Sequence, residues 1–84
     1  MYWDVIDVKV EGNLLLNVRF ADGTSGRVRF APQHLTGIFE PLQDPLFFSR
    51  VHIDGGVVVW PNEIDLAPDA MYREIKKHGE WVLQ

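Results

Sequence analysis

The sequence predicts an α+β fold: an antiparallel meander sheet of about five strands, short helical turns in the middle, and one C-terminal helix packed on the sheet. Apolar and polar residues alternate through most of the first 30 residues, and apolar residues recur at helical spacing near the C-terminus. These two periods are typical of half-buried strands and of an amphipathic helix. With 84 residues, the chain has room for a single domain, residues 1–84.

Three strands are expected at the start of the chain. Residues 5–10, 14–20 and 27–30 alternate apolar and polar side chains, which puts the apolar set of each strand on one face of a sheet. The segments between them, 11–13 and 21–26, contain glycine beside Asn or Asp and suit tight turns. Consecutive strands joined in this way pair antiparallel.

The middle of the chain is expected to form short helical turns. Three prolines interrupt residues 31–45, and proline breaks the interior of a helix and of a central strand. Asp44 followed by Pro45 is a typical helix start, because Asp caps the first turn and proline fits its first position.

A hairpin and a helix complete the predicted fold. Residues 50–54 and 57–60 flank Gly55-Gly56, a pair that favours a two-residue hairpin turn. Pro68 suits the first turn of the last helix and Gly79 suits its end.

The inward positions of these elements form the predicted core. Residues 80–84 follow the helix as a tail, and its Trp81 and Leu83 are too apolar to remain in solvent. The tail therefore covers its own sheet or adds to that of a second copy, and we expect a homodimer with the tail or the Tyr2-Trp3 segment at the contact. The predicted core residues are Leu16, Val18, Phe20, Val28, Phe30, Val51, Ile53, Val58, Met71 and Ile75.

The residues give no sign of catalysis or metal binding. The chain has no cysteine, its serines lie outside nucleophile motifs, and His34, His52 and His78 form no short-spaced ligand pair. We expect a protein that is not an enzyme, that binds no metal, and that uses no cofactor.

Several aromatic and turn residues are candidates for contact with a partner, because Trp and Tyr are enriched at binding hot spots. Trp60 ends a strand. There it either closes the edge of the core, with its N–H bonded to a backbone carbonyl, or stands exposed for recognition. Other candidates lie near the termini, which often approach each other in a small domain. These candidate interaction residues are Tyr2, Trp3, Trp60, Asn62, Asp65 and Trp81.

Three arginines are further candidates. Arg19, Arg27 and Arg29 fall on the outward face of two predicted strands. This alternation is typical of any solvated sheet face, and it also suits an acidic partner. Direct binding of nucleic acid is not expected, because the net charge of −4 opposes contact with phosphates.

The chain carries no targeting signal that the sequence reveals. Its first residues lack the basic start and apolar run of a secretory signal. No stretch approaches the roughly 20 apolar residues of a membrane span. Because cysteine is also absent, we expect a cytoplasmic protein without membrane contact.

Residues 60–69, which read Trp-Pro-Asn-Glu-Ile-Asp-Leu-Ala-Pro-Asp, resemble the signature of a small bacterial family. It is number twenty-four forty-two among the domains of unknown function. Phe-Ala-Asp-Gly at 20–23, Leu-Thr-Gly at 35–37 and Pro-Leu-x-Asp at 41–44 agree in order with that family. Members of the family commonly carry glycine where this chain has Glu63, so the turn there is expected either to place Asn62 alone at positive φ or to be of another type.

The resemblance implies an α+β fold with an antiparallel sheet and a C-terminal helix, and it implies little chemistry. Some relatives look like N-terminal domains of helix-turn-helix regulators, and others look like stand-alone proteins encoded beside small toxins. The first hypothesis is therefore a non-enzymatic protein-binding module, such as a toxin-neutralising partner of a small bacterial protein. The alternative is a ligand-sensing regulatory domain related to the regulators.

Overall fold

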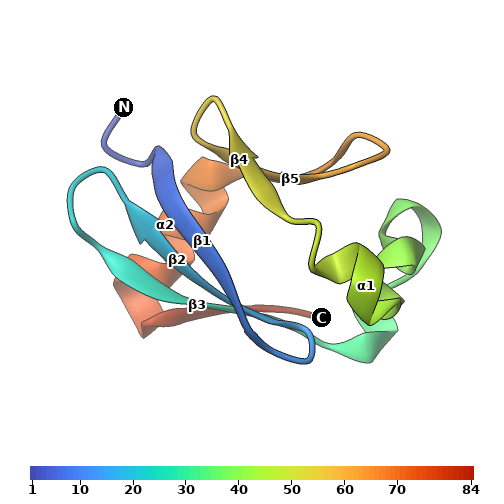
Figure 1. Cartoon of the computed structure of the whole chain (residues 1–84). Helices are drawn as coiled ribbons and strands as arrows, with labels where there is room; N and C mark the ends of the chain where they lie inside the picture. The colour runs from blue at the N-terminus through green and yellow to red at the C-terminus, as the bar shows by residue number, and fades with distance from the viewer.

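In the computed structural model, which describes residues 1–84, the strands form two sheets (Figure 1). The larger sheet has the strand order β1-β2-β3-β7 and the smaller one the order β4-β5-β6. The strands are β1 (Val5–Gly12), β2 (Leu15–Phe20), β3 (Ser25–Phe30), β4 (His52–Asp54), β5 (Val57–Trp60), β6 (Ile64–Leu66) and β7 (Glu80–Leu83).

Short helical segments link the two sheets. Two 3-10 helices, Pro32–His34 and Gly37–Gln43, precede the helix α1 (Pro45–Phe48). The side chain of Asp44 accepts a hydrogen bond from the Leu46 N–H at 3.0 Å, so the predicted cap is present. None of the helices has the length and apolar content that crossing a membrane requires.

The C-terminal helix α2 (Pro68–His78) follows the predicted pattern. Pro68 lies in its first turn, and Gly79 ends it in a left-handed conformation with φ of 80°. The Gly79 N–H donates to the Ile75 carbonyl at 2.7 Å, which satisfies one of the last free carbonyls of the helix.

The α+β class and the C-terminal helix are confirmed, and the single five-stranded antiparallel meander is wrong. β1, β2 and β3 pair antiparallel as expected. β7, predicted as a tail, pairs with β3 in parallel, with Val28 opposite Trp81. The β4–β5 hairpin does not extend this sheet and instead pairs with β6 in a sheet of its own.

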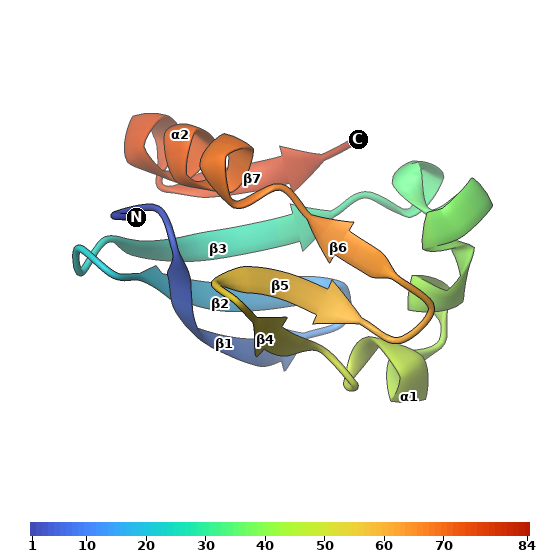
Figure 2. The ribbon, with the colours of Figure 1, turned by 90° about the horizontal axis from the view of Figure 1, so that it is seen from above.

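The core lies between the larger sheet on one side and the smaller sheet with α2 on the other. Figure 2 shows the smaller sheet over β1 and β2 and shows α2 beside β7, and β1 contacts both β4 and β5. The buried residues are Val5, Leu16, Val18, Phe20, Val28, Phe30, Leu35, Leu42, Phe48, Val58, Trp60, Ile64, Leu66, Met71, Ile75 and Leu83.

Two predicted core residues need correction. Val51 and Ile53 are only partly buried and pack against the margin of the core. Ile53 lies on β4, a three-residue strand at the edge of the smaller sheet, so one side of it remains open. The core also contains residues of β6 and of the helical middle segment that the predicted list left out, including Ile64, Leu42 and Phe48.

The turn between β5 and β6 contains two residues with positive φ. Asn62 has φ of 69° and Glu63 has φ of 62°. The structure therefore does not leave Asn62 alone in this conformation. Asn tolerates it, whereas a Glu side chain with its Cβ is disfavoured there.

Replacing Glu63 by glycine is expected to stabilise the protein. Glycine removes the Cβ strain at positive φ, and part of this gain is offset by the greater freedom of the unfolded chain, so the net gain is about 0.5–1 kcal/mol. Urea unfolding of Glu63→Gly and Glu63→Ala measures the effect. Alanine keeps the strain and should give no gain. A Glu63→Gly variant less stable than the wild type would show that the positive φ at Glu63 does not strain the fold.

Candidate functional site

The N-terminal aromatic residues lie against the exposed side of α2. The Tyr2 ring lies 4.8 Å from the Trp3 ring and 5.0 Å from the Tyr72 ring, centroid to centroid, both edge to face. Tyr72 meets the buried Phe20 in the same way at 5.1 Å. We call these four residues the aromatic ladder. Each such contact contributes roughly 0.5–1.5 kcal/mol, so the half-buried Tyr72 ring, and through it the exposed Tyr2 ring, is held in place from the core.

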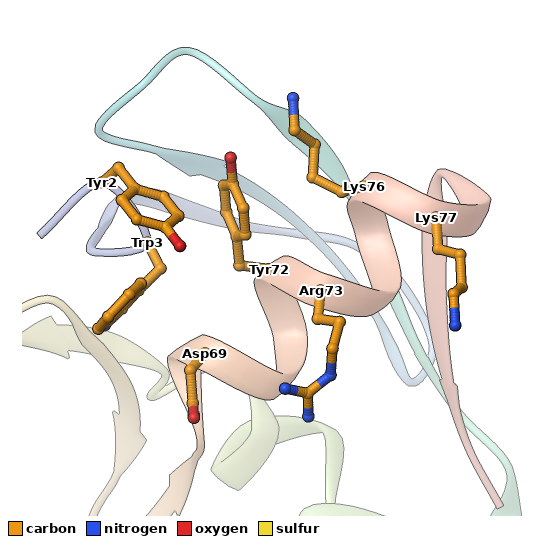
Figure 3. A pocket seen from close by; sticks show the side chains of 7 residues that line it. All are labelled: Tyr2, Trp3, Asp69, Tyr72, Arg73, Lys76 and Lys77. Atoms are coloured by element: carbon orange, nitrogen blue, oxygen red, sulfur yellow. The ribbon is translucent and has the colours of Figure 1, made fainter.

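A pocket of about 540 Å³ opens at the surface end of the aromatic ladder (Figure 3). Tyr2, Trp3 and Tyr72 line it together with Asp69 and the cation cluster, which we define as Arg73, Lys76 and Lys77. Figure 3 shows Trp3 and Asp69 toward one end, with Lys76 and Lys77 further along α2.

One exposed face of α2 supplies the charged side of this pocket. Residues three and four apart share a helix face, and this spacing joins Asp69 to Arg73, and Tyr72 to Lys76. On the inward side of the helix, Met71 and Ile75 are buried.

The cation cluster forms none of the ion pairs of the structure. The three ion pairs of the structure use the N-terminus, Arg27 and Arg29. Lys76 instead holds its Nζ 5.9 Å from the centroid of the Tyr72 ring, a cation–π distance. Three positive charges therefore gather here on a chain whose net charge is −4. Asp69 lines the same pocket, and the charge of Lys76 contributes to the lowered pKa of Asp22, so the cluster carries an excess of positive charge rather than isolated cations.

A hydrogen bond ties the aromatic ladder to the turn between β2 and β3. The Tyr72 hydroxyl donates to Asp22 Oδ2 at 2.5 Å, and Asp22 Oδ1 accepts from the Thr24 N–H at 2.9 Å. The bond from Tyr72 is the main reason that the pKa of Asp22 lies below its usual 3.8. The same bond holds the pKa of Tyr72 above its usual 10.0.

The stability that this bond contributes is expected to depend on pH. Because the pKa of Asp22 is lowered, its contribution is present above the usual carboxyl range and is lost as pH falls through the lowered value. Because the pKa of Tyr72 is raised, its contribution is present below about pH 10 and is lost as pH rises through the raised value. Urea unfolding at a series of pH values should show Tyr72→Phe less stable than the wild type near neutrality, with convergence at both extremes.

Tyr2→Phe is the matched control for this pH series. The Tyr2 ring belongs to the same aromatic ladder, and its hydroxyl makes none of the side-chain hydrogen bonds in the structure, so its removal should leave the acid side of the pH dependence unchanged. On the alkaline side the charge of Tyr2 contributes to the raised pKa of Tyr72, so the comparison with this control is made below pH 7. Parallel pH profiles for Tyr72→Phe and the wild type would show that the Tyr72–Asp22 bond does not stabilise the fold.

Trp60, a predicted interaction residue, lies in the core. Its exposed fraction is 2%, and its Nε1–H donates to the Phe48 carbonyl at 2.9 Å. Trp60 therefore closes the core, as the first of the two alternatives predicted. Its prediction as an exposed interaction residue is wrong, because a buried ring offers no surface to a partner.

The other predicted aromatic and turn candidates do not join the pocket. Trp81 is half-buried on β7 and packs against the core. The two termini lie apart in both views (Figures 1 and 2). Asn62 and Asp65 are exposed on the turn before β6 and on β6 itself. Tyr2 and Trp3 are therefore the predicted aromatic candidates that the structure brings together with further binding groups.

The three candidate arginines lie on the open face of the larger sheet. Arg27 Nε lies 2.9 Å from Glu11 Oε1, and Arg29 Nε lies 3.6 Å from Glu80 Oε1. Arg19 stands opposite Asp7 across the strand pair. Acidic neighbours thus accompany all three, as on an ordinary solvated sheet face, and the predicted stripe carries little excess positive charge.

Sequence reasoning missed the helix side of the pocket. It named no residue of α2 as a candidate for contact with a partner. The three- and four-residue spacing from Asp69 to Lys77 was a signal for one shared exposed face. No group of His, Asp or Glu side chains is arranged to hold a metal ion.

Fold and pocket together define a small two-sheet α+β domain with an open aromatic and cationic pocket. Over residues 5–77 the sequence matches the family described as "Protein of unknown function (DUF2442)", and the chain belongs to this family. Searches of curated proteins and of solved structures each return no match. The matched range starts after Tyr2 and Trp3 and ends before β7.

Proposed function

We propose that the protein is a non-enzymatic protein-binding module whose binding surface is the pocket between the aromatic ladder and the cation cluster. The observation that supports this proposal most is the edge-to-face contact of the exposed Tyr2 ring with the half-buried rings of Trp3 and Tyr72, beside three cations that form no ion pair. Tyr and Trp offer large contact areas with few rotatable bonds. Because Phe20 holds Tyr72 in place from the core, a partner would meet a surface that is already ordered.

The kind of partner we propose is a small bacterial protein in the cytoplasm that this module restrains, as a toxin-neutralising protein does. Such a role needs a surface that covers part of the partner and needs no chemistry from this chain. Some relatives look like stand-alone proteins encoded beside small toxins, and this supports the same role by analogy.

Co-purification with matched charge-reversal variants tests the proposal. A stoichiometric protein should come with the tagged full chain from cells of its source and be identified by mass spectrometry. Arg73→Glu combined with Lys77→Glu should lose it, because both cations line the pocket. Lys9→Glu combined with Arg19→Glu changes the net charge equally on exposed residues elsewhere and should keep it.

Two outcomes would refute this function. One is retention of the partner by the Arg73/Lys77 double variant. The other is equal loss from both double variants, which would mean a general charge effect rather than a binding surface. Circular dichroism of each variant confirms that it is folded before the comparison is made.

The alternative function, a ligand-sensing regulatory domain, is favoured by the pocket volume. About 540 Å³ lies within the range of roughly 300–1,000 Å³ typical of small-molecule sites. A small ligand would raise the midpoint of thermal unfolding, and the Arg73/Lys77 double variant would lose this rise. A thermal-shift screen of small anionic and aromatic compounds therefore distinguishes the two functions.

We also propose a homodimer, for which only one of the two expected contact segments remains free. Residues 80–83 pair with β3 of the same chain, so the tail covers its own sheet. The remaining expected contact, Tyr2 and Trp3, lies in the proposed binding surface, so a second copy and the partner would compete for it. Sedimentation equilibrium at high micromolar concentration should give a dimer mass that Trp3→Ala reduces to that of the monomer.

A further inference from the structure

We infer that the pocket takes an acidic segment of the partner protein that carries an aromatic or large apolar anchor beside its carboxylates. This inference rests on the proposed function and adds the chemistry of the partner to it. Three features support this occupant: charge complementarity, the order of groups along α2, and the match between helix rise and strand rise.

The order of groups along α2 gives the pocket two unlike ends. Trp3 and Asp69 stand at the end near the start of the helix, and Lys76 and Lys77 stand at its last turn (Figure 3). An apolar side chain suits the first end, where three aromatic rings meet. A carboxylate beside Asp69 would be repelled, whereas carboxylates over Lys76 and Lys77, which form no ion pair, would meet an excess of positive charge.

The helix rise gives the spacing between anchor and acids. Tyr72 and the two lysines are separated by four and five residues, or roughly 6–8 Å along the helix axis. An extended strand advances about 3.3 Å per residue. An acid two residues from the anchor of an extended partner segment therefore matches this distance and lies on the same side of the segment, and an acid at the next position adds negative charge nearby.

Aromatic rings beside cations also suit single-stranded nucleic acid, which stacks its bases on such rings. Here the aromatic end carries the carboxylates of Asp69 and of Asp22, which accepts the Tyr72 hydrogen bond. Each stacked base would bring its own phosphate to these carboxylates. A peptide can keep its charges apart from its uncharged anchor, and for this reason the arrangement favours an acidic peptide.

Titration of the ¹⁵N-labelled full chain with four short peptides tests the inference. The first probe is a ten-residue Gly/Ser peptide with one Trp and with Glu two and three residues after it. The others replace Trp by Gly, both Glu by Gln, or both Glu by Lys. The first peptide should shift the backbone signals of residues 2–3 and 69–77. It should also shift the indole N–H signal of Trp3 and leave that of the buried Trp60 in place.

The expected affinities follow from the two contacts. Removing either the anchor or the acids should weaken binding about tenfold or more, since each removes one half of the complementarity. Raising the salt concentration from about 50 to 500 mM should weaken the binding of the first peptide several-fold, because exposed charges are screened. The Arg73/Lys77 double variant should lose this salt dependence, and the Lys9/Arg19 double variant should keep it.

Three results would overturn the acidic-segment inference. They are binding of the Lys peptide as tight as that of the Glu peptide, shifts centred on the open face of the larger sheet, and tighter binding of an oligothymidine probe at the same residues. A co-purified partner that depends on the pocket but is insensitive to salt would leave the proposed function intact while refuting this chemistry. Absence of any pocket-dependent partner would refute the function itself, whatever the peptides show.

Discussion

Replacing Trp60 by alanine is expected to lower the free energy of unfolding by about 3–5 kcal/mol. The ring is 2% exposed and lies between Phe48 and Phe30, with centroids 5.8 and 6.0 Å away. Its loss opens a cavity where the smaller sheet meets α1 and leaves the Phe48 carbonyl without its 2.9 Å hydrogen bond. Because small domains have only about 5–15 kcal/mol of total stability, much of this variant should be unfolded at physiological temperature. Urea unfolding followed by circular dichroism measures the loss.

Two further variants separate the ring from its hydrogen bond. Trp60→Phe keeps an aromatic ring and removes the N–H, so it should lose about 1–3 kcal/mol. Trp81→Ala removes the same side chain from a half-buried position on β7 and should be the milder of the two alanine variants. A Trp60→Ala variant that loses less than about 1 kcal/mol would show that Trp60 does not close the core.

The parts of the fold that sequence predicts well are those whose signals are local. β1, β2 and β3 are visible in the alternation of their side chains, since neighbouring residues of a strand face opposite sides. The ends of α2 are visible in Pro68 and Gly79, whose backbone preferences act at a single position. The same holds for Asp44, whose capping bond reaches only two residues along the chain.

The parts that sequence missed are short or depend on distant partners. In β6, Ile64 and Leu66 are buried and Asp65 is exposed, a true alternation that is too brief to distinguish a strand from a connector. β7 has three consecutive apolar residues, Trp81 to Leu83, rather than an alternation. Its partner β3 lies about fifty residues earlier, and a parallel pairing at that distance leaves no local mark. The division into two sheets is equally hidden, since no local pattern shows which strands do not pair.

The aromatic half of the candidate site could be predicted from the sequence, and the helix half could not. Tyr2 and Trp3 stand out as large aromatic residues near the start of the chain, and this alone marks them for recognition. Which surface they lie against depends on how α2 packs on β3 and β7. Tyr72 shows the difficulty, because one edge of its ring meets the buried Phe20 while its hydroxyl reaches the exposed Asp22.

Replacing Gly26 by alanine is expected to lower the free energy of unfolding by about 3 kcal/mol, at the upper end of the usual cost of overpacking. Gly26 lies on β3 and faces α2. A Cβ there would come within 2.6 Å of Ile75 Cγ2 and 2.7 Å of the Gly79 carbonyl oxygen. The second of these is backbone at the end of α2, so the side chain can be accommodated only by moving the helix and β7 away from β3. Urea unfolding should show the loss of stability.

Gly12→Ala is the matched control for this close approach. Gly12 also lies in a strand of the larger sheet, and a Cβ there would meet nothing within 4 Å, so its replacement should change stability by less than about 0.5 kcal/mol. Shortening Ile75 to alanine should make the Gly26→Ala change less damaging than it is in the wild type, because the two side chains compete for one space. The Gly79 carbonyl would still oppose the Cβ, so the rescue should be partial. Equal losses for Gly26→Ala and Gly12→Ala would mean that α2 can move away from β3 at little cost. The helix that carries the cation cluster would then not be fixed against the sheet at this point.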